Sequence, residues 1–281
     1  MGQSIAFLPL NSGASIPQFG FGTYKLTGQD AYDGVRDALE LGYRHIDTAQ
    51  MYGNEAEVGH ALADTSLARK EIFVTSKLNN PNHEPDIARE SLQRSLEDLQ
   101  LDYLDLFLIH WPLPMFYGGD IMPTWRAMES FVDEGLVRSI GVSNFEAHHL
   151  APILEQGRIM PAVNQIESHP YFANRELHRF NAEHGIITEA WAPLARGTVL
   201  SEPSIIEIAR EVGARESQVV LRWALQRGDI VFPKASSHEH RAENLDVSGF
   251  ELTAEQIARI DALDRGEAGR TGKHPDVMDR M

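Results

Sequence analysis

Three consecutive apolar segments of the chain end in ionisable side chains. The first ends in Asp47 and is followed by Tyr52, the second ends in Lys77, and the third leads into His110. A phenol with an ordinary pKa near about 10 exchanges protons poorly at pH 7 unless a nearby cation stabilises its phenolate. Lys77 can be that cation, Asp47 can keep the lysine charged, and His110 can orient a carbonyl group. These residue types therefore indicate proton transfer at a carbonyl oxygen.

A single acidic, basic or imidazole side chain at the end of a strand is more often a cap or a surface group than a catalytic one. Four such groups at the ends of consecutive strands favour catalysis, because an ionisable cluster is an expensive structural device. Whether the four side chains meet depends on the elements that carry them.

Short apolar segments recur along the whole chain, and a segment with helical periodicity follows each of them. Apolar runs of this length are typical of buried parallel strands. We predict eight strands, at residues 19–23, 44–48, 72–77, 103–109, 137–142, 161–166, 186–191 and 229–232. We predict that helices follow them, at residues 28–41, 54–64, 84–99, 122–134, 146–156, 173–184, 216–227 and 238–246.

Eight strand–helix units without a flexible linker predict an α/β fold, a single (β/α)8 TIM barrel in one domain over residues 1–281. Residues 4–18 read as a β-hairpin that could plug one end of the barrel. Further helices are expected at 203–212 and 253–264, the latter followed by a Gly- and charge-rich tail predicted to be a mobile loop. Catalytic residues of such barrels lie at the C-terminal ends of the strands, where the four ionisable residues stand.

Composition limits the function further. The 281 residues carry 25 Lys and Arg against 41 Asp and Glu, a net charge of −16, which argues against a nucleic-acid partner. The chain has no cysteine, so catalysis must use oxygen and nitrogen groups. We find no secretory signal and no apolar run long enough to span a bilayer. We therefore expect a cytoplasmic monomer that does not bind membranes and acts on a small molecule.

Six segments in order resemble the aldo-keto reductase family over essentially the whole chain. They are residues 47–55 (DTAQMYGNE), 75–77 (TSK), 109–112 (IHWP), 141–145 (GVSNF), 164–167 (NQIE) and 232–234 (FPK). The resemblance implies a (β/α)8 barrel that reduces aldehydes and ketones with NAD(P)H, with Asp47, Tyr52, Lys77 and His110 as a catalytic tetrad. Residues 190–194 and 269–276 look like those of bacterial 2,5-diketo-D-gluconate reductases, which suggests this or another dicarbonyl as substrate.

The resemblance also implies a cofactor site. Trp191 offers an aromatic face for the nicotinamide ring, with core packing as the alternative role. The other cofactor contacts that the resemblance implies, besides Asp47, are Gly22, Thr23, Ser143, Asn144, Gln165, Leu194, Arg196, Gly197, Lys234, Ser236, His240, Arg241, Glu243 and Asn244. Trp111, Tyr24 and Phe116 are expected at the substrate pocket, although Phe116 could equally serve loop packing.

The chain departs from its family where the 2′-phosphate of the cofactor is bound. Ala235 replaces a hydroxyl residue and His240 replaces an arginine, while Lys234 remains. We therefore expect NADPH as the cofactor, with NADH as a weaker alternative. No metal is expected, because neither His148-His149 nor the pair His238 and His240 has the spacing of helical zinc ligands.

Two other functions stay open. A cofactor-binding regulatory protein with little turnover would share this barrel, but the intact tetrad argues against it. A metal-dependent barrel hydrolase or isomerase would need carboxylate and histidine clusters at other strand ends, and these are scarce.

Overall fold

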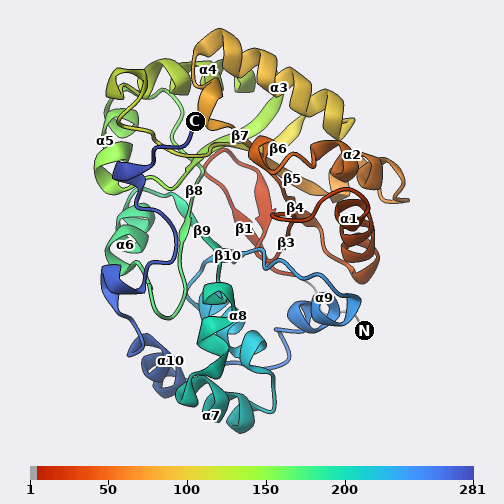
Figure 1. Cartoon of the computed structure of the whole chain (residues 1–281), viewed down its shortest axis with the longest axis vertical. Helices are drawn as coiled ribbons and strands as arrows, with labels where there is room; N and C mark the ends of the chain where they lie inside the picture. Colours follow the sequence, from red (N-terminus) through yellow and green to blue (C-terminus); the bar gives the residue numbers. More distant parts are fainter. Residues whose placement is uncertain (1–4) are drawn as a thin grey trace.

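The computed structural model describes residues 5–281 and contains eight parallel strands arranged around one axis (Figure 1). Each strand pairs with the next in chain order, and a bridge between Phe19 and Val231 joins the first to the last, which closes the barrel. All eight predicted strands are confirmed. They are β3 (Phe21–Gly22), β4 (His45–Asp47), β5 (Phe73–Leu78), β6 (Leu104–Ile109), β7 (Val137–Ser143), β8 (Val163–Glu167), β9 (Ile187–Trp191) and β10 (Ile230–Val231).

Helices surround the barrel, and their buried apolar side chains pack on the strands or on neighbouring helices. In α3 (Pro85–Leu99), for example, Leu92, Leu96 and Leu99 are buried, as the spacing predicts, whereas Ile87 is exposed. The other helices also match the predicted segments within two or three residues: α1 (Gln29–Leu41), α2 (Glu55–Ala63), α4 (Met122–Asp133), α5 (Ala147–Gln156), α6 (Arg175–Glu183), α7 (Pro203–Val212), α8 (Glu216–Gln226), α9 (His238–Leu245) and α10 (Ala254–Asp261).

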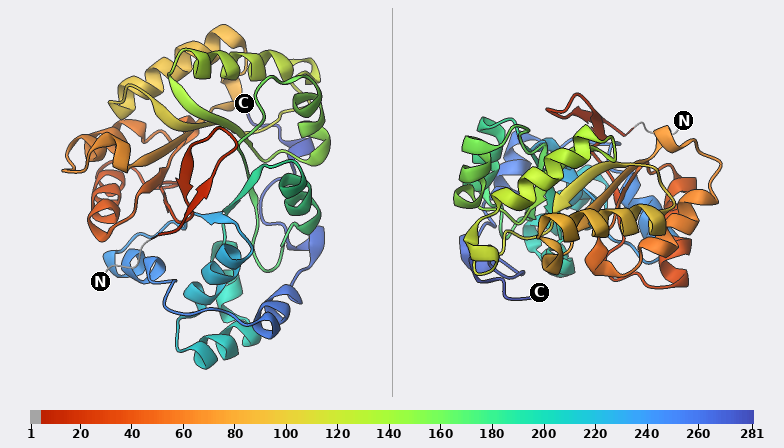
Figure 2. Two further views of the ribbon diagram at one scale, coloured as in Figure 1. Left: turned by 180° about the vertical axis from the view of Figure 1, so that it is seen from behind. Right: turned by 90° about the horizontal axis from the view of Figure 1, so that it is seen from above.

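An N-terminal hairpin plugs the end of the barrel at which the strands begin. Its strands are β1 (Phe7–Pro9) and β2 (Ser15–Pro17), and residue 4, the first of the predicted hairpin, lies outside the described residues. Leu10 and Ile16 are buried against interior side chains such as Phe73 and Ile230. In Figure 2 (right) the hairpin and the C-terminus lie at opposite ends of the barrel. The hairpin therefore closes the end away from the predicted site.

The C-terminal tail is held in place, whereas the sequence predicts a mobile loop. Figure 1 shows it running along the α6 and α5 side of the barrel. Met278 packs on Trp111 and Leu113, and the carbonyl of Arg280 accepts a hydrogen bond from Asn80 Nδ2 at 2.7 Å. The Gly and charged residues of the tail suggest that it is exposed and mobile. In the structure, however, backbone groups of the tail form hydrogen bonds with side chains of the barrel. Among the described residues, no helix has the length and apolarity to cross a membrane.

Candidate active site

The four ionisable residues predicted to act together converge at the C-terminal end of the barrel. Asp47 ends β4, Lys77 lies in the neighbouring strand β5, and His110 follows β6 directly. Tyr52 ends the short 3-10 helix η1 (Gln50–Tyr52), which stops at Gly53 in a left-handed conformation with φ 64°. Because η1 directly follows β4, the phenol is carried back over the barrel mouth.

Lys77 lies at the centre of the cluster and is fully buried. Its Nζ donates to Asp47 Oδ1 at 2.7 Å, to the carbonyl of Thr48 at 2.8 Å and to the Tyr52 hydroxyl at 3.3 Å. These three bonds use all three hydrogens of the ammonium group. The ammonium is thus fixed between a carboxylate and a phenol.

Burial and charge set the protonation of the cluster. Burial alone would lower the pKa of Lys77, but Asp47 and Tyr52 raise it above its ordinary value, so Lys77 stays protonated. Burial raises the pKa of Tyr52 to about 12, while Lys77 acts in the opposite direction. Lys77 lowers the pKa of Tyr52, as the sequence predicts, but by less than burial raises it. The phenol is therefore protonated at neutral pH, the form that a proton donor needs.

His110 is neutral and close to the phenol. Burial, together with the charge of Lys77, holds the pKa of His110 well below its usual value. Its ring lies 5.9 Å from the Tyr52 ring, centroid to centroid, at 76°. Its Nδ1 is buried with no hydrogen-bond partner among the described residues. A neutral imidazole beside a phenol can donate a hydrogen bond to a carbonyl oxygen without competing for its proton.

Asn144 ties the neighbouring elements together. Its Nδ2 donates to the carbonyl of His110 at 2.9 Å and to Ser143 Oγ at 3.1 Å, and its Oδ1 accepts from Trp191 Nε1 at 2.8 Å. Ser143 Oγ in turn donates to the carbonyl of Gln165. The amide of Asn144 is therefore engaged within the protein, where the resemblance predicts a cofactor contact.

Gln165 also binds inside the barrel. Its Nε2 donates to Asp47 Oδ2 and to Glu189 Oε2, both at 2.8 Å, which leaves its Oε1 for other partners. Glu189 was not among the predicted site residues. The sequence feature that could have indicated Glu189 is its charge inside the apolar segment 186–191. It lies two positions before Trp191 and therefore on the same face of the strand.

Gly22 and Thr23, predicted to approach the cofactor, make structural contacts. A Cβ atom on Gly22 would lie 2.6 Å from the carbonyl oxygen of Phe232, so glycine is needed for the closure of the barrel. Thr23 is fully buried, and its backbone N–H donates to the carbonyl of Asp47. These contacts give both residues a packing role that does not depend on a ligand.

Exposed groups suited to phosphate lie on the loops after β9 and β10. Arg196 and Gly197 stand in left-handed conformations, with φ 56° and 89°, within the 3-10 segment η5 (Ala195–Ser201), next to half-buried Leu194. Lys234 and Ser236 are exposed after β10. Neither Arg196 nor Lys234 forms an ion pair with the described residues. Two free cations in so acidic a chain can receive an anionic ligand.

The predicted cofactor contacts on α9 differ in exposure and in whether another side chain of the protein already binds them. His240 is exposed, whereas Arg241 is buried with its Nε 2.5 Å from Asp37 Oδ2 on α1 and its Nη1 on the carbonyl of Ala235. Glu243 pairs with Arg215 at 2.8 Å, and Asn244 is buried. The Arg241 charge is thus already neutralised by Asp37.

Of the predicted substrate-pocket residues, Tyr24 contacts the phenol of Tyr52 directly. Tyr24 is 56% exposed, with its ring 5.1 Å from that of Tyr52. Trp111, next to His110, is buried in a small apolar cluster to which Phe116 and the tail residue Met278 also belong. The sequence did not indicate that the tail would contribute to this wall.

Glu167, at the end of β8, fastens the tail. Its carboxylate accepts from the backbone N–H and the hydroxyl of Thr271 at 2.7 and 2.6 Å and from the N–H of Gly272 at 2.9 Å. A Cβ atom on Gly272 would lie 2.4 Å from the Trp191 ring. The tail therefore lies directly against the aromatic ring that is expected to stack on a cofactor.

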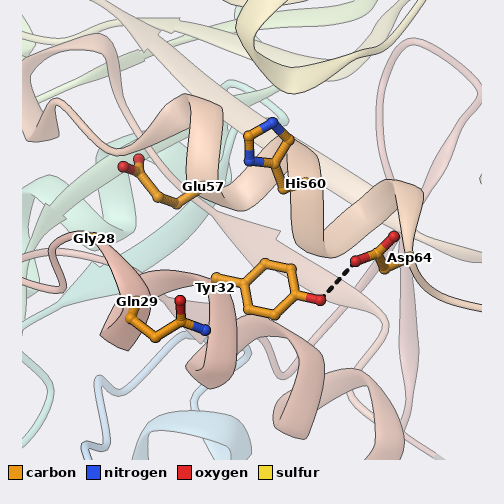
Figure 3. Close-up of a pocket in the computed structure, with 6 residues that line it drawn as sticks. All are labelled: Gly28, Gln29, Tyr32, Glu57, His60 and Asp64. Atoms are coloured by element: carbon orange, nitrogen blue, oxygen red, sulfur yellow. Dashed lines mark hydrogen bonds between the residues drawn. The ribbon is translucent and has the colours of Figure 1, made fainter.

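Two other polar features lie outside this cluster. A surface groove between α1 and α2 is lined by Gly28, Gln29, Tyr32, Glu57, His60 and Asp64, and Figure 3 shows the Tyr32 hydroxyl donating to Asp64. It contains none of the predicted site residues.

The second feature is formed by His148, His149 and Asp276, whose potential ligand atoms lie within 4.8 Å of one another. His149 Nδ1 accepts the backbone N–H of Glu146, so the proton of its neutral ring sits on Nε2, which lies 3.0 Å from Asp276 Oδ1 but forms no hydrogen bond with the described residues. The hydrogen bond that ties α5 to the tail joins His148 Nε2 to Asp276 Oδ1, at 2.9 Å.

A closed parallel barrel with a buried lysine–aspartate pair against a half-buried tyrosine is the arrangement of an oxidoreductase that acts on carbonyl groups. The aldo/keto reductase family model matches residues 18–265, and the chain belongs to this family. It is 42% identical over 271 residues to the glyoxal reductase of Bacillus subtilis (strain 168), covering 96% of both chains.

The chain is also 43% identical over 269 residues to the methylglyoxal reductase DkgA of Salmonella typhimurium (strain LT2), covering 95% of this chain and 96% of the relative. Among solved structures, that of a Gox0644 mutant in complex with NADPH superimposes with a TM-score of 0.94 at 40% identity, covering 99% of this chain and 100% of the other.

Proposed function

We propose that the protein reduces aldehydes and ketones with NADPH and that Tyr52 donates the proton to the carbonyl oxygen. One observation carries the proposal: the same Lys77 ammonium binds both Asp47 and the Tyr52 hydroxyl in a buried site. A phenol placed this way can release its proton, because the adjacent cation stabilises the phenolate that remains.

The described residues fit NADPH, which supplies a hydride to the carbonyl carbon when bound. The half-buried Trp191 can stack on the nicotinamide ring, and Gln165 Oε1 can accept from its carboxamide. Arg196 and Gly197 can hold the pyrophosphate, and Lys234 the 2′-phosphate. The support is that two cations without ion pairs stand exposed on these loops in a chain of net charge −16.

The protein residues divide the proton step between them. Tyr52 gives its proton to the carbonyl oxygen as negative charge develops there. Lys77 stabilises the resulting phenolate, and Asp47 keeps Lys77 oriented and charged. Neutral His110 donates a hydrogen bond to the same oxygen and fixes its angle.

We infer that the preference for NADPH over NADH is narrower than in relatives with an arginine at position 240. Arginine presents a permanently charged fork to phosphate, and a neutral imidazole offers a single donor. Arg241 is a poor substitute, because Asp37 and the carbonyl of Ala235 already occupy its guanidinium group.

We propose small dicarbonyl compounds as the substrate class. Two relatives carry the names glyoxal reductase and methylglyoxal reductase, and Trp111, which directly follows His110, belongs to an apolar cluster with Phe116 and Met278. 2,5-Diketo-D-gluconate is the finer alternative that the sequence resemblance suggests.

Oxidation of NADPH followed with methylglyoxal, glyoxal, 2,5-diketo-D-gluconate and a simple monoaldehyde tests the function. We expect turnover with all aldehydes and the largest kcat/KM for a dicarbonyl. NADPH binding without turnover of any carbonyl would contradict the proposal and favour a regulatory protein.

A further inference from the structure

Glu189 is a buried carboxyl group that the proton step above does not use. It lies on β9, and its side chain shares the barrel interior with Trp191, because alternate residues of a strand point to the same side. It is completely buried. Its neighbour across the sheet is Gln165 on β8, and Ile230 pairs with it on β10. Burial of a glutamate side chain among apolar residues costs free energy unless specific partners stabilise it.

Glu189 is connected to the catalytic phenol by an unbroken series of hydrogen bonds. Gln165 Nε2 donates one hydrogen to Glu189 Oε2 and the other to Asp47 Oδ2, both at 2.8 Å. The other oxygen of Asp47 accepts from Lys77, which also binds Tyr52. The amide of Gln165 therefore links the carboxyl group of Glu189 to Asp47, and Glu189 helps to orient that amide.

The charges in this interior do not balance if both carboxyl groups are ionised. Among residues 5–281, the charges that act on Glu189 are those of the cation Lys77 and the anion Asp47, while its strand neighbours Gln165 and Ile230 are uncharged. A second carboxylate would leave a net negative charge out of contact with water, at a large desolvation cost. Glu189 Oε1 is also buried without a hydrogen-bond partner among the described residues. A proton on Oε1 makes the cluster neutral.

We propose that Glu189 is a positioning residue that carries a proton at neutral pH, holds Asp47 in place through Gln165, and slows carbonyl reduction when it ionises. The proposal rests on the reductase function proposed above. In support, burial and, to a smaller degree, the charge of Asp47 raise the pKa of Glu189 to about 8.

The consequence for the reaction follows from charge. An ionised Glu189 adds a negative charge beside Asp47 and opposes the phenolate that forms as Tyr52 gives up its proton. Tyr52 itself, with a pKa of about 12, does not ionise over this range. If activity falls between about pH 7 and pH 9.5, ionisation of Glu189 and not of the Tyr52 phenol is therefore the expected cause.

The test compares the pH dependence of kcat/KM for methylglyoxal reduction in the wild type and in Glu189→Gln. Glutamine keeps an acceptor for Gln165 but has no proton to lose. We expect the wild type to lose about tenfold by roughly pH 9, as the protonated fraction falls, and Glu189→Gln to stay flat. Activity of the two proteins at pH 7 should agree within about threefold.

Glu55→Gln is the matched control. Glu55 is also a buried carboxyl group with a raised pKa, but its oxygens accept from Ser76 and Ser95 and do not bind the tetrad. Its variant should keep the wild-type pH profile. Glu189→Met is a second variant, which should also be flat but less active at pH 7, because Gln165 loses its acceptor.

Superimposable profiles for the wild type and Glu189→Gln would overturn the proposal, as would an identical change in Glu55→Gln. Infrared spectra provide a readout that needs no turnover. The carbonyl band of a protonated carboxyl group should disappear between about pH 7 and pH 9.5 in the wild type and be absent in Glu189→Gln. If the wild type reduces no carbonyl compound, the proposed function fails, and the infrared result still decides whether Glu189 is protonated.

Discussion

Asn144 Oδ1 accepts the indole N–H of Trp191 at 2.8 Å, and the same amide binds the carbonyl of His110. One side chain thus holds both the aromatic ring expected under the nicotinamide and the histidine beside the phenol. Asn144 stands at φ 63°, a left-handed conformation that asparagine adopts more readily than most residues. The strand end therefore ties the position of the Trp191 ring to that of the His110 backbone.

The first prediction concerns Trp191. Trp191→Leu should raise the Kd for NADPH by about 2- to 10-fold, since an aromatic stacking contact contributes about 0.5 to 1.5 kcal/mol. Trp191→Phe keeps a ring face and should bind within about threefold of the wild type. Fluorescence titration measures both. If Trp191→Leu bound NADPH normally, the ring would serve only to pack against Gly272.

The second prediction concerns the proton donor. Tyr52→Phe should keep the fold and NADPH binding but lower kcat/KM by at least about 10²-fold, because only the transferable proton is removed. Steady-state kinetics and circular dichroism measure the two effects. Retention of more than a tenth of the wild-type turnover would assign the proton to another group, with His110 as the obvious candidate.

The third prediction concerns the coupling of Lys77 to Tyr52. Lys77→Met should be as damaging as Tyr52→Phe, because the phenolate loses the cation that stabilises it. The double variant should be little worse than either single one, since the two residues act as a unit. Losses that multiply in the double variant would show that they act independently.

The fourth prediction concerns cofactor choice. His240→Arg should raise the NADPH over NADH ratio of kcat/KM by roughly 5- to 30-fold, the equivalent of about 1 to 2 kcal/mol for one charged hydrogen bond. His238→Arg is the control, because it adds the same charge two residues away, where His238 already contacts Asp37. An equal response of both variants would indicate a general charge effect instead of a contact at position 240.

The fifth prediction links Glu189 to stability. Its pKa is raised from 4.5 to about 8, so between these values the unfolded chain releases a proton that the folded protein keeps. Stability therefore falls as pH rises through this window and is unaffected below it. Glu189→Gln removes this loss. The free energy of unfolding of the variant minus that of the wild type, both measured by urea denaturation, should increase by a few kcal/mol from about pH 5 to pH 8. A constant difference would mean that Glu189 is ionised in the folded protein.

Much of the site could be predicted from the sequence because it depends on local patterns. Strand and helix periodicity predicts eight βα units, and the C-terminal ends of parallel strands must meet at one end of a barrel. Asp47, Lys77 and His110 stand at such ends, so their convergence follows from the order of the strands. Tyr52 follows β4 closely enough to reach them.

The tertiary structure decided which distant groups face each other and how deeply they are buried. Arg241 binds Asp37 across 204 positions, and Glu167 binds Thr271 across 104. Periodicity tells which face of an element is buried but not which side chain of a remote element lies opposite. The raised pKa of Tyr52 and of Glu189 depends on the whole surroundings that exclude water, and no stretch of sequence contains those surroundings.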